Sequence, residues 1–385
     1  MLEPIRILRV ISRMNVGGPA WQSSVLTKSL NKEDFSTKLL CGDVENYEGD
    51  YLELQAPEIS ITKINSLGRS VNLYEDFKAF FKIRQEIKSF KPHIIHTHTT
   101  KAGVLGRLAG LSMKVPIRVH TFHGHLLEGY FSKPVENLIR VIESQIAKTT
   151  TALIAVGSKV RDDLLKAGIG VEAQYAVIPP GVVFKPSIEQ EKAREILGIP
   201  KESPVIVFVG RLTKIKRPDR LLKMMEIVKE KLPNALLLIA GEGDLFLPVK
   251  EEAKNLDSSV IFLGWREDLE NIFAAADLGV LSSDNEGTPL SLIESAAAGL
   301  PCVTTNVGSA GEIVIHNETG LVVDRSASAL ADAVLKLLEN KTLLHSMGSE
   351  AKKHASSHFR VERLIADHIS LYKKLILSTQ ASSSE

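Results

Sequence analysis

Short apolar runs alternate with longer segments of helical periodicity along the whole chain. The runs that predict strands lie at residues 5–11, 37–40, 93–96, 117–122, 151–156, 176–178, 205–209, 235–240, 260–263, 278–281, 302–305 and 321–323. Segments with apolar residues three and four apart predict helices at 21–30, 74–90, 135–148, 219–232, 269–276, 289–298 and 327–339. Continuous apolar strands that alternate with helices are typical of parallel sheets covered on both faces.

A boundary between two domains is predicted near Pro179-Pro180-Gly181, where proline and glycine end a strand and begin a connector, and the polar stretch 185–195. We expect two doubly wound α/β domains with Rossmann-like parallel sheets, residues 1–184 and 185–359, facing each other across a cleft. An amphipathic segment at 360–377 predicts a last helix that packs back on the first domain. Ligands of such sheets bind beyond the carboxyl ends of the strands, so the loops that follow the strands are the candidate sites.

Composition narrows the class of protein. Of 385 residues, 44% are hydrophobic and 24% charged, as in soluble globular proteins. Residues 1–184 carry 23 Lys and Arg against 18 Asp and Glu (+5), and the remainder 24 against 28 (−4). This balance does not suggest a nucleic-acid binder, although a basic first domain is compatible with an anionic partner. Cys41 and Cys302 are far apart, and no signal peptide or membrane-spanning stretch is recognised, so we expect a cytoplasmic protein.

The most informative segment follows the predicted strand 278–281 and reads SSDNEGTPLSLIESAAAGLP. Thr288 is a plausible N-cap and Pro289 suits the first helical position, so a helix should begin there. Its first turn would offer backbone N–H groups to an anion. Glu286 precedes that turn, and Glu294, inside the helix, has a carboxylate that can accept both hydroxyls of a ribose. An ordinary capped helix with an exposed Glu294 explains the spacing equally well.

A second segment, GRLTKIKRPD at 210–219, places cations after a strand. Fixed cations there could stabilise the negative charge of a departing diphosphate in place of a metal, and no Asp-x-Asp occurs. Gly17 and Gly18 follow the first strand and would let a ligand approach the backbone, or would simply make a turn. The pattern is not G-x-G-x-x-G, so it does not predict dinucleotide binding.

Six histidines lie within 33 residues, but Glu128 is the only acid near them, so a metal site is not expected. They are His93, His96, His98, His120, His123 and His125.

These segments together resemble the motifs of family 4 glycosyltransferases. EGTPLSLIESAAAGLP is similar to the EGxPLxxLEAxAxGxP signature, with Ile293 and Ser295 as mild departures. The segment at 210–217 resembles GRLxxxKG, with Arg217 where glycine is commonest. This resemblance implies that Arg211 and Lys216 stabilise the departing diphosphate, and Lys214 and Arg217 are expected as surface charges. Gly17-Gly18-Pro19 and Thr121-Phe122-His123-Gly124 resemble the family's GG(A/P) and T-x-H-G segments, and the strand end at His96 and His98 its HxH. The resemblance implies the GT-B fold and a retaining, nucleotide-sugar-dependent enzyme.

The resemblance also implies roles for individual residues. Glu294 would hold the donor ribose, Glu286 the hydroxyls of the transferred sugar, and His123 would lie near the anomeric carbon. The expected catalytic residues are His123, Glu286, Arg211 and Lys216. The expected donor-binding residues are Gly17, Gly18, Arg211, Lys216, Glu286, Gly287, Thr288, Pro289, Leu290 and Glu294.

The implied reaction moves a hexosyl group from a nucleotide sugar, with UDP favoured, to a lipid-linked or saccharide acceptor in bacterial surface-polysaccharide or glycoconjugate synthesis. No cofactor and no metal are expected. A GDP-mannose-dependent mannosyltransferase and a nucleotide-sugar epimerase on the same fold are the alternatives, and an idle binding protein is the rival outside enzymes. The basic, apolar stretch 101–110 with Lys114 and Arg118 is either an ordinary buried helix or a peripheral contact with the inner face of a membrane.

Overall fold

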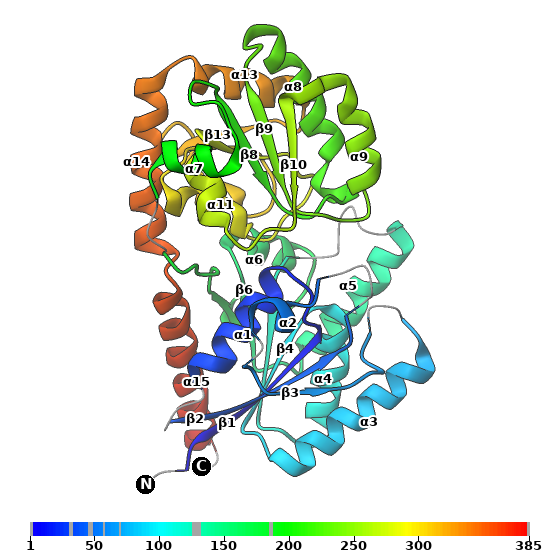
Figure 1. Ribbon diagram of the computed structural model, residues 1–385. Helices are drawn as coiled ribbons and strands as arrows, with labels where there is room; N and C mark the ends of the chain where they lie inside the picture. Colours follow the sequence, from blue (N-terminus) through cyan, green and yellow to red (C-terminus); the bar gives the residue numbers. More distant parts are fainter. Residues whose placement is uncertain are drawn as a thin grey trace. The chain divides into compact units, whose positions relative to one another are not determined.

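The computed structural model describes residues 3–30, 34–44, 49–56, 58–68, 71–124, 132–184 and 188–382. The chain forms two compact units (Figure 1). Unit 1 comprises Met1–Pro180 together with Glu362–Glu385, and unit 2 comprises Gly181–Val361. The last helix therefore belongs to unit 1 although it follows unit 2 in the sequence.

Unit 1 is built on a seven-stranded parallel sheet with the order β3-β2-β1-β4-β5-β6-β7. Its strands are β1 (Ile5–Arg13), β2 (Phe35–Gly42), β3 (Ile61–Lys63), β4 (Ile94–His98), β5 (Ile117–Phe122), β6 (Ala152–Ala155) and β7 (Tyr175–Val177). Its helices are α1 (Gly18–Leu30), α2 (Tyr51–Gln55), α3 (Leu73–Phe90), α4 (Thr100–Ser112), α5 (Lys133–Ala147), α6 (Ser158–Lys166), the 3-10 turn η1 (Glu172–Gln174) and α15 (Val361–Ser382).

Helices cover both faces of this sheet because its strands are apolar on both sides. Successive side chains of a strand point to opposite faces. On β1, Ile7 packs in one cluster with residues of α1 and α15, including Leu26 and Tyr372. Its neighbour Leu8 packs in another with residues of α3 and α4. The α1 and α15 side and the α3 and α4 side are thus the two faces of the unit.

Unit 2 repeats the plan with a six-stranded parallel sheet in the order β10-β9-β8-β11-β12-β13. Its strands are β8 (Val205–Val209), β9 (Leu236–Ala240), β10 (Val260–Gly264), β11 (Leu278–Leu281), β12 (Cys302–Thr305) and β13 (Gly320–Val323). Its helices are α7 (Gln190–Leu197), η2 (Lys214–Lys216), α8 (Pro218–Lys231), α9 (Phe246–Glu252), η3 (Ala253–Ser259), α10 (Leu269–Ala275), α11 (Leu290–Ala298), α12 (Ala310–Ile313), α13 (Ala327–Leu338) and α14 (Lys341–His358).

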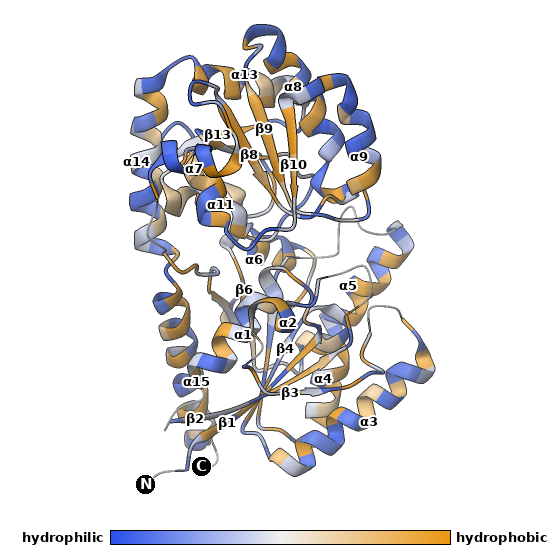
Figure 2. Cartoon of the chain, in the orientation of Figure 1, coloured by the Kyte–Doolittle hydropathy of each residue, from blue (hydrophilic) through white to orange (hydrophobic). Residues whose placement is uncertain are grey.

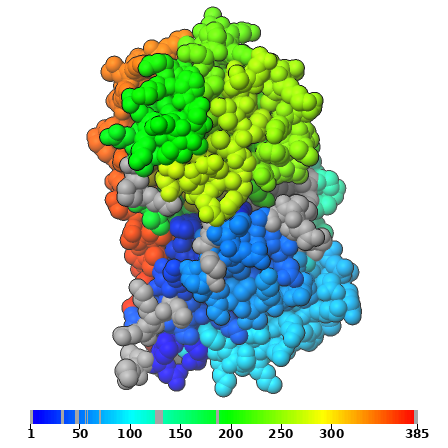
Figure 3. Space-filling view, viewed as in Figure 1, coloured from blue at the N-terminus to red at the C-terminus, as the bar shows by residue number. Residues whose placement is uncertain are grey.

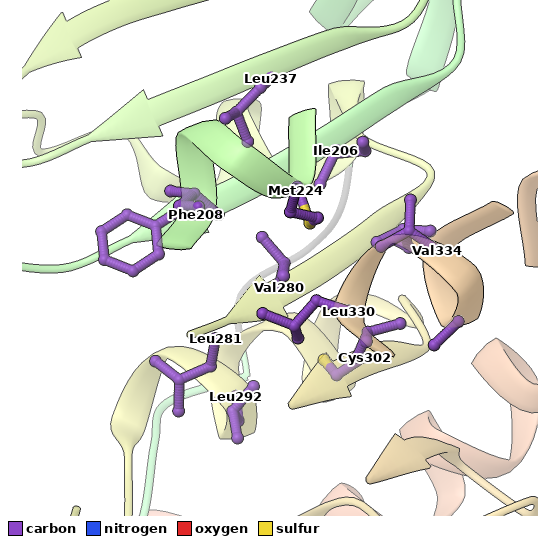
Figure 4. Packing of buried hydrophobic residues seen from close by; sticks show 14 of the residues in the cluster. Ile206, Phe208, Met224, Leu237, Val280, Leu281, Leu292, Cys302, Leu330 and Val334 are labelled. Atoms are coloured by element: carbon purple, nitrogen blue, oxygen red, sulfur yellow. The ribbon is translucent and has the colours of Figure 1, made fainter. Parts of the chain in front are cut away.

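The main core of unit 2 lies between its sheet and the helices α8, α11 and α13. Ile206, Val280 and Cys302 of the sheet meet Met224 of α8 and Leu330 of α13 (Figure 4). A second cluster covers the other face and includes side chains of α7 and α10. Close packing on both faces fixes the strands whose carboxyl ends carry the candidate site.

The doubly wound α/β fold predicted from the sequence is confirmed, and each predicted strand is present within a few residues. Two local expectations were wrong. The polar stretch 185–195 is not only a connector: α7 begins inside it with Glu189 as its N-cap, because Ala193 and Arg194 are buried there. Helix α11 begins at Leu290, one residue later than predicted, and Pro289 is its extended N-cap with ψ of 116°.

None of the helices in the described ranges is both long and apolar enough to cross a membrane.

Candidate functional site

The candidate site of unit 2 lies where its sheet changes winding direction. From β8 the chain goes to β9 on one side of the sheet, whereas β11 pairs with β8 on the other side. Ligands of open α/β sheets bind at such a switch point. The loops after β8 and β11 are joined there: the Asp284 N–H donates to the Ile215 carbonyl at 2.8 Å, and Ser282 Oγ donates to the Lys216 carbonyl at 2.8 Å.

Lys216 and Glu286 meet at this point although 70 residues separate them. Lys216 Nζ lies 2.5 Å from Glu286 Oε1, and Ser283 Oγ donates to the same oxygen at 2.5 Å. The two charged side chains are only 20% and 10% exposed. A charge pair this shielded from water is stronger than one on the surface, and its ammonium is placed beside the edge where an anion would bind.

A second network of ion pairs links the loops after β8 and β11. Arg220, a buried residue of α8, contacts Asp284 at 2.7 Å, and Arg217 contacts both Asp284 and Asp219, at 3.1 and 2.7 Å. Burial opposes ionisation of Asp284, but Arg220 and Arg217 hold its pKa below the usual value. Arg217 is therefore a structural cation rather than the surface charge expected from the sequence.

The backbone at Glu286 and Gly287 is fixed by the loop after β12. The Ser309 N–H donates to the Gly287 carbonyl at 2.9 Å. Gly308 has a φ of +47°, and a Cβ at that position would lie 1.9 Å from the Glu286 carbonyl oxygen. Only glycine allows this approach, so Gly308 is a site-shaping residue that the sequence motifs did not identify.

Helix α11 follows at once and carries the remaining predicted donor residues. Leu292 and Ile293 are the first residues whose N–H groups reach the Pro289 carbonyl. The N–H groups of Leu290 and Ser291 have no acceptor within the helix and lie at its positive end. Thr288 precedes the helix and Glu294 lies within it, both half-buried. Glu286, Gly287, Thr288, Pro289 and Leu290 thus form one continuous edge beside Lys216.

Arg211 is placed differently from Lys216. It follows Gly210 at the carboxyl end of β8, and its side chain is exposed. Gly210 and its neighbour Gly241 approach closely, because a Cβ on Gly241 would lie 2.2 Å from the Gly210 carbonyl oxygen. Arg211 therefore starts the same loop as Lys216 without sharing its shielded position.

The predicted residues of unit 1 also lie at the carboxyl edge of their sheet. Gly17 has a φ of +156°, a conformation that favours glycine, and Gly18 is the first residue of α1. His98 ends β4 and His123 follows β5, its neighbour in the sheet. His98 Nδ1 lies 3.0 Å from His123 Nε2. Burial lowers the pKa of His123 to about 3, so this imidazole is neutral at physiological pH.

Of the remaining histidines between residues 93 and 125, His93, His96 and His120 have partners within unit 1. His96 contacts Thr121 Oγ1 at 2.7 Å and Tyr372 OH at 2.6 Å, and His120 contacts Thr97 Oγ1 at 2.8 Å on the opposite face. His125 lies outside the described residues. Over the part of the chain that the structure describes, no three His, Cys, Asp or Glu side chains are grouped as a metal site requires.

Comparison with known proteins gives the family of this chain. The sequence model of Glycosyltransferase Family 4 matches residues 16–184, and that of Glycosyl transferases group 1 matches residues 189–354. A D-inositol 3-phosphate glycosyltransferase of Corynebacterium urealyticum is 32% identical over 307 residues, which are 73% of this chain and 71% of the relative. The chain belongs to glycosyltransferase family 4.

Other relatives of this glycosyltransferase match over nearly their full length. The UDP-Gal:alpha-D-GlcNAc-diphosphoundecaprenol alpha-1,3-galactosyltransferase of Escherichia coli is 29% identical over 359 residues, 91% of this chain and 92% of the relative. Among solved structures, Anabaena Alr3699/HepE in complex with UDP and glucose has a TM-score of 0.81 at 20% identity, covering 96% of this chain and 100% of the other. That likeness establishes the GT-B fold, while the residue roles stay predictions.

Proposed function

We propose that this glycosyltransferase moves a hexosyl group from a UDP-sugar to a lipid-linked or saccharide acceptor, with retention of anomeric configuration and without a metal or cofactor. The shielded Lys216–Glu286 pair beside the start of α11 is the observation that carries this proposal. A departing diphosphate needs fixed positive charge, and Lys216 and the helix N-terminus both supply it. Glu286 then faces the sugar that the diphosphate carries.

Two similarities favour a UDP-sugar and a surface-polysaccharide setting. The E. coli relative is named for a UDP-galactose donor and a lipid diphosphate acceptor, and it matches almost the whole chain. HepE, which shares the fold, is solved with UDP and glucose. A GDP-mannose donor stays the alternative, because no described contact in unit 2 selects a base. An epimerase is no longer supported, since the family transfers sugars.

In the mechanism that we propose, the acceptor oxygen attacks the anomeric carbon from the side that the diphosphate leaves. The new carbon–oxygen bond forms as the bond to the phosphate oxygen breaks, and the acceptor proton passes to that phosphate oxygen. Lys216, Arg211 and the N–H groups at the start of α11 stabilise the growing negative charge. Glu286 orients the sugar and is never glycosylated, so mass spectrometry of a stalled turnover mixture should find no sugar on it.

The donor site is tested by calorimetric titration of UDP, GDP, ADP and TDP in the presence of a chelator. We expect UDP alone to bind tightly, and Glu294→Ala to weaken it by about 1.5–3 kcal/mol through loss of the ribose contact. Glu318→Ala removes the same charge from an exposed site elsewhere in unit 2 and serves as the control. Binding of GDP instead would favour GDP-mannose as the donor. If no nucleotide binds, with or without added Mg²⁺, the proposed function is wrong.

We further propose that the outer surface of α3, α4 and α5 contacts an anionic membrane. Helix α4, the stretch considered from the sequence, is largely buried and exposes only Leu108 and Leu111 among its large apolar side chains. Of the 17 exposed large hydrophobic residues described, 11 lie between residues 71 and 142, so the exposure is concentrated rather than scattered. They are Val71, Leu73, Tyr74, Phe77, Phe81, Leu108, Leu111, Val135, Leu138, Val141 and Ile142.

The charges around these side chains favour an anionic partner. Lys78, Lys82, Lys88, Lys114 and Arg140 are exposed, whereas every acidic residue described between 71 and 150 is at least half-buried. Orange segments interrupt the blue of α3 and α5 in Figure 2, and α3 lies on the face toward the viewer in Figure 3. Apolar side chains among cations suit insertion between anionic headgroups.

Vesicle sedimentation tests this surface. Wild type should bind vesicles that contain phosphatidylglycerol and not pure phosphatidylcholine. The double substitution of Phe77 and Phe81 by serine should weaken vesicle binding about 30-fold, because the bilayer then no longer buries two aromatic side chains. Leu247→Ser, at a still more exposed apolar residue of α9, should leave vesicle binding unchanged. If both vesicle types are bound equally, or if Leu247→Ser weakens binding as much as the double substitution, the membrane proposal is wrong. Neither result would contradict the proposed donor site.

A further inference from the structure

Unit 1 buries a cation that no described carboxylate accompanies. Arg9 of β1 is 0% exposed. Its Nη1 donates to Tyr372 OH and to His96 Nδ1, both at 3.1 Å. Its Nε and Nη2 are buried and have no hydrogen-bond partner. The guanidinium charge therefore acts on its neighbours with little to offset it.

Those neighbours are imidazoles on the same face of the sheet. Arg9 pairs in register with His96 of β4, and His98 lies two residues further on that face. The rings of His96 and His98 are 4.3 Å apart, and those of His98 and His123 are 5.3 Å apart. Burial first, then charged neighbours that include Arg9, hold the pKa of His98 well below its usual value. His98 and His123 are therefore both neutral, and each has one N–H and one bare nitrogen.

The hydrogen bond between these two rings can be drawn in two ways. His98 Nδ1 lies 3.0 Å from His123 Nε2, and either nitrogen can be the donor. His98 Nε2 settles the choice, because it is buried without a partner. If His123 donated, the proton of His98 would sit on this nitrogen as an unpaired N–H, with its positive end in the field of Arg9. If His98 donates, the nitrogen is a bare lone pair, which that field stabilises.

From this geometry we infer that His98 Nδ1–H donates to His123 Nε2, so that His123 carries its own proton on Nδ1 and presents a hydrogen-bond donor to its ligand. His98 is then a positioning residue that fixes the tautomer of His123. Under the proposed function, on which this last step rests, the sugar group that meets His123 must accept a hydrogen bond, as a hydroxyl oxygen does. An acceptor proton cannot pass to His123 Nε2, because that nitrogen is already occupied.

Nitrogen-15 NMR of histidine-labelled full-length protein measures the tautomer without any activity assay. Long-range proton–nitrogen correlations separate protonated from bare ring nitrogens, and His123→Gln and His98→Gln assign the two rings. We expect His123 with protonated Nδ1 and bare Nε2, and His98 with the same pattern. A His123 with protonated Nε2, or a doubly protonated ring near neutral pH, overturns the inference.

Variants at His98 test whether the tautomer of His123 affects turnover. Asparagine places an amide N–H near the position of Nδ1, so His98→Asn should keep the His123 tautomer and most of kcat. His98→Ala should give mixed tautomers and lower kcat at least tenfold with little change in the affinity for UDP. His120→Asn, on the opposite face and bonded to Thr97, is the matched control. If His98→Asn and His98→Ala are equally impaired while both stay folded, the positioning role is wrong. If the wild-type protein does not bind UDP, that result would instead count against the proposed function.

Discussion

At the scale of single residues, Lys216 is the group whose removal tests the charge arrangement most directly. Its ammonium is shielded and bonded to Glu286 at 2.5 Å, so its position is fixed before any ligand arrives. Because the charge on the diphosphate grows as the sugar departs, Lys216→Ala should mainly lower kcat, by about 1.5–3 kcal/mol in activation free energy or roughly 10- to 150-fold. Steady-state kinetics with the UDP-sugar would measure it.

The control for this substitution lies two residues away. Lys214 is exposed in the same turn, so Lys214→Ala removes an equal charge without touching Glu286. It should leave kcat within about twofold, as surface charges are screened. A kcat that falls equally in both variants would point to the general electropositive field of the loop rather than to the Lys216–Glu286 pair.

A second residue-scale prediction concerns pH. The pKa of Asp284 is lowered in the folded protein, so its ionised form stabilises the fold above the ordinary aspartate pKa of about 4 and loses this effect as the pH falls further. Asp284→Asn should cost about 1–2 kcal/mol of unfolding free energy at pH 7, given its partial exposure. Urea unfolding should show that the difference in unfolding free energy between wild type and Asp284→Asn shrinks between pH 5 and pH 3. A gap that does not change with pH would contradict this origin.

The sequence motifs name candidate site residues, but they do not give the contacts that these residues make. Lys216 and Glu286 are both candidates from the sequence, but nothing in a linear pattern says that their side chains are in contact across 70 residues. Arg217 was misjudged for the same reason, since Asp284, its distant partner, becomes a neighbour only when β8 and β11 pair. Gly308 carried no signal because its constraint, the Glu286 carbonyl, comes from another loop.

At the scale of elements, the loop after β12 acts as a support for the donor edge. Gly308→Ala would force a Cβ against the Glu286 carbonyl oxygen at 1.9 Å in a backbone conformation with φ of +47°. The loop that holds Glu286 and Gly287 must then shift. We expect a stability loss of about 2 kcal/mol or more and a UDP affinity at least tenfold weaker, measured by thermal unfolding and calorimetry.

Gly311 provides the comparison for Gly308. It lies three residues on, in α12, with no atom within 4 Å of an added Cβ. Alanine there should be neutral or slightly stabilising, since alanine is the better helix former. If Gly311→Ala weakened UDP binding as much as Gly308→Ala, flexibility of the whole segment and not the contact with Glu286 would be responsible.

Elements were predictable where burial alone decides their form. The continuous apolar runs became strands because both faces of each sheet are covered. Helix α7 was missed because its sequence is mainly polar, and its buried anchor is Arg194, which pairs with Asp277 at 2.9 Å. The start of α11 was misplaced by one residue because Pro289 is compatible with both an N-cap and a first helical turn, and its ψ of 116° decides between them.

At the scale of the whole molecule, each unit is described by its own sheet and core, and α15 completes the core of unit 1. Leu364 and Tyr372 of α15 pack with Ile7, Leu26 and Ile94. Tyr372 also bonds Arg9 and His96 through its buried hydroxyl group. Residues of α15 are therefore needed for the stability of the first strands of the chain. We expect each unit to have its own thermal transition, which shifts when a substitution or a ligand affects that unit.

Tyr372→Phe and UDP should act on different transitions in scanning calorimetry. Removing the hydroxyl leaves Arg9 and His96 with fewer partners inside unit 1, at a cost of about 1–3 kcal/mol, so the transition of unit 1 should move down. UDP should raise the transition of unit 2, which holds Lys216 and α11, because binding to the native state stabilises it. Tyr74→Phe, at an exposed residue of α3, should change neither transition. If Tyr372→Phe and UDP instead move one common transition, the two units unfold as a single cooperative body, and α15 couples their stabilities.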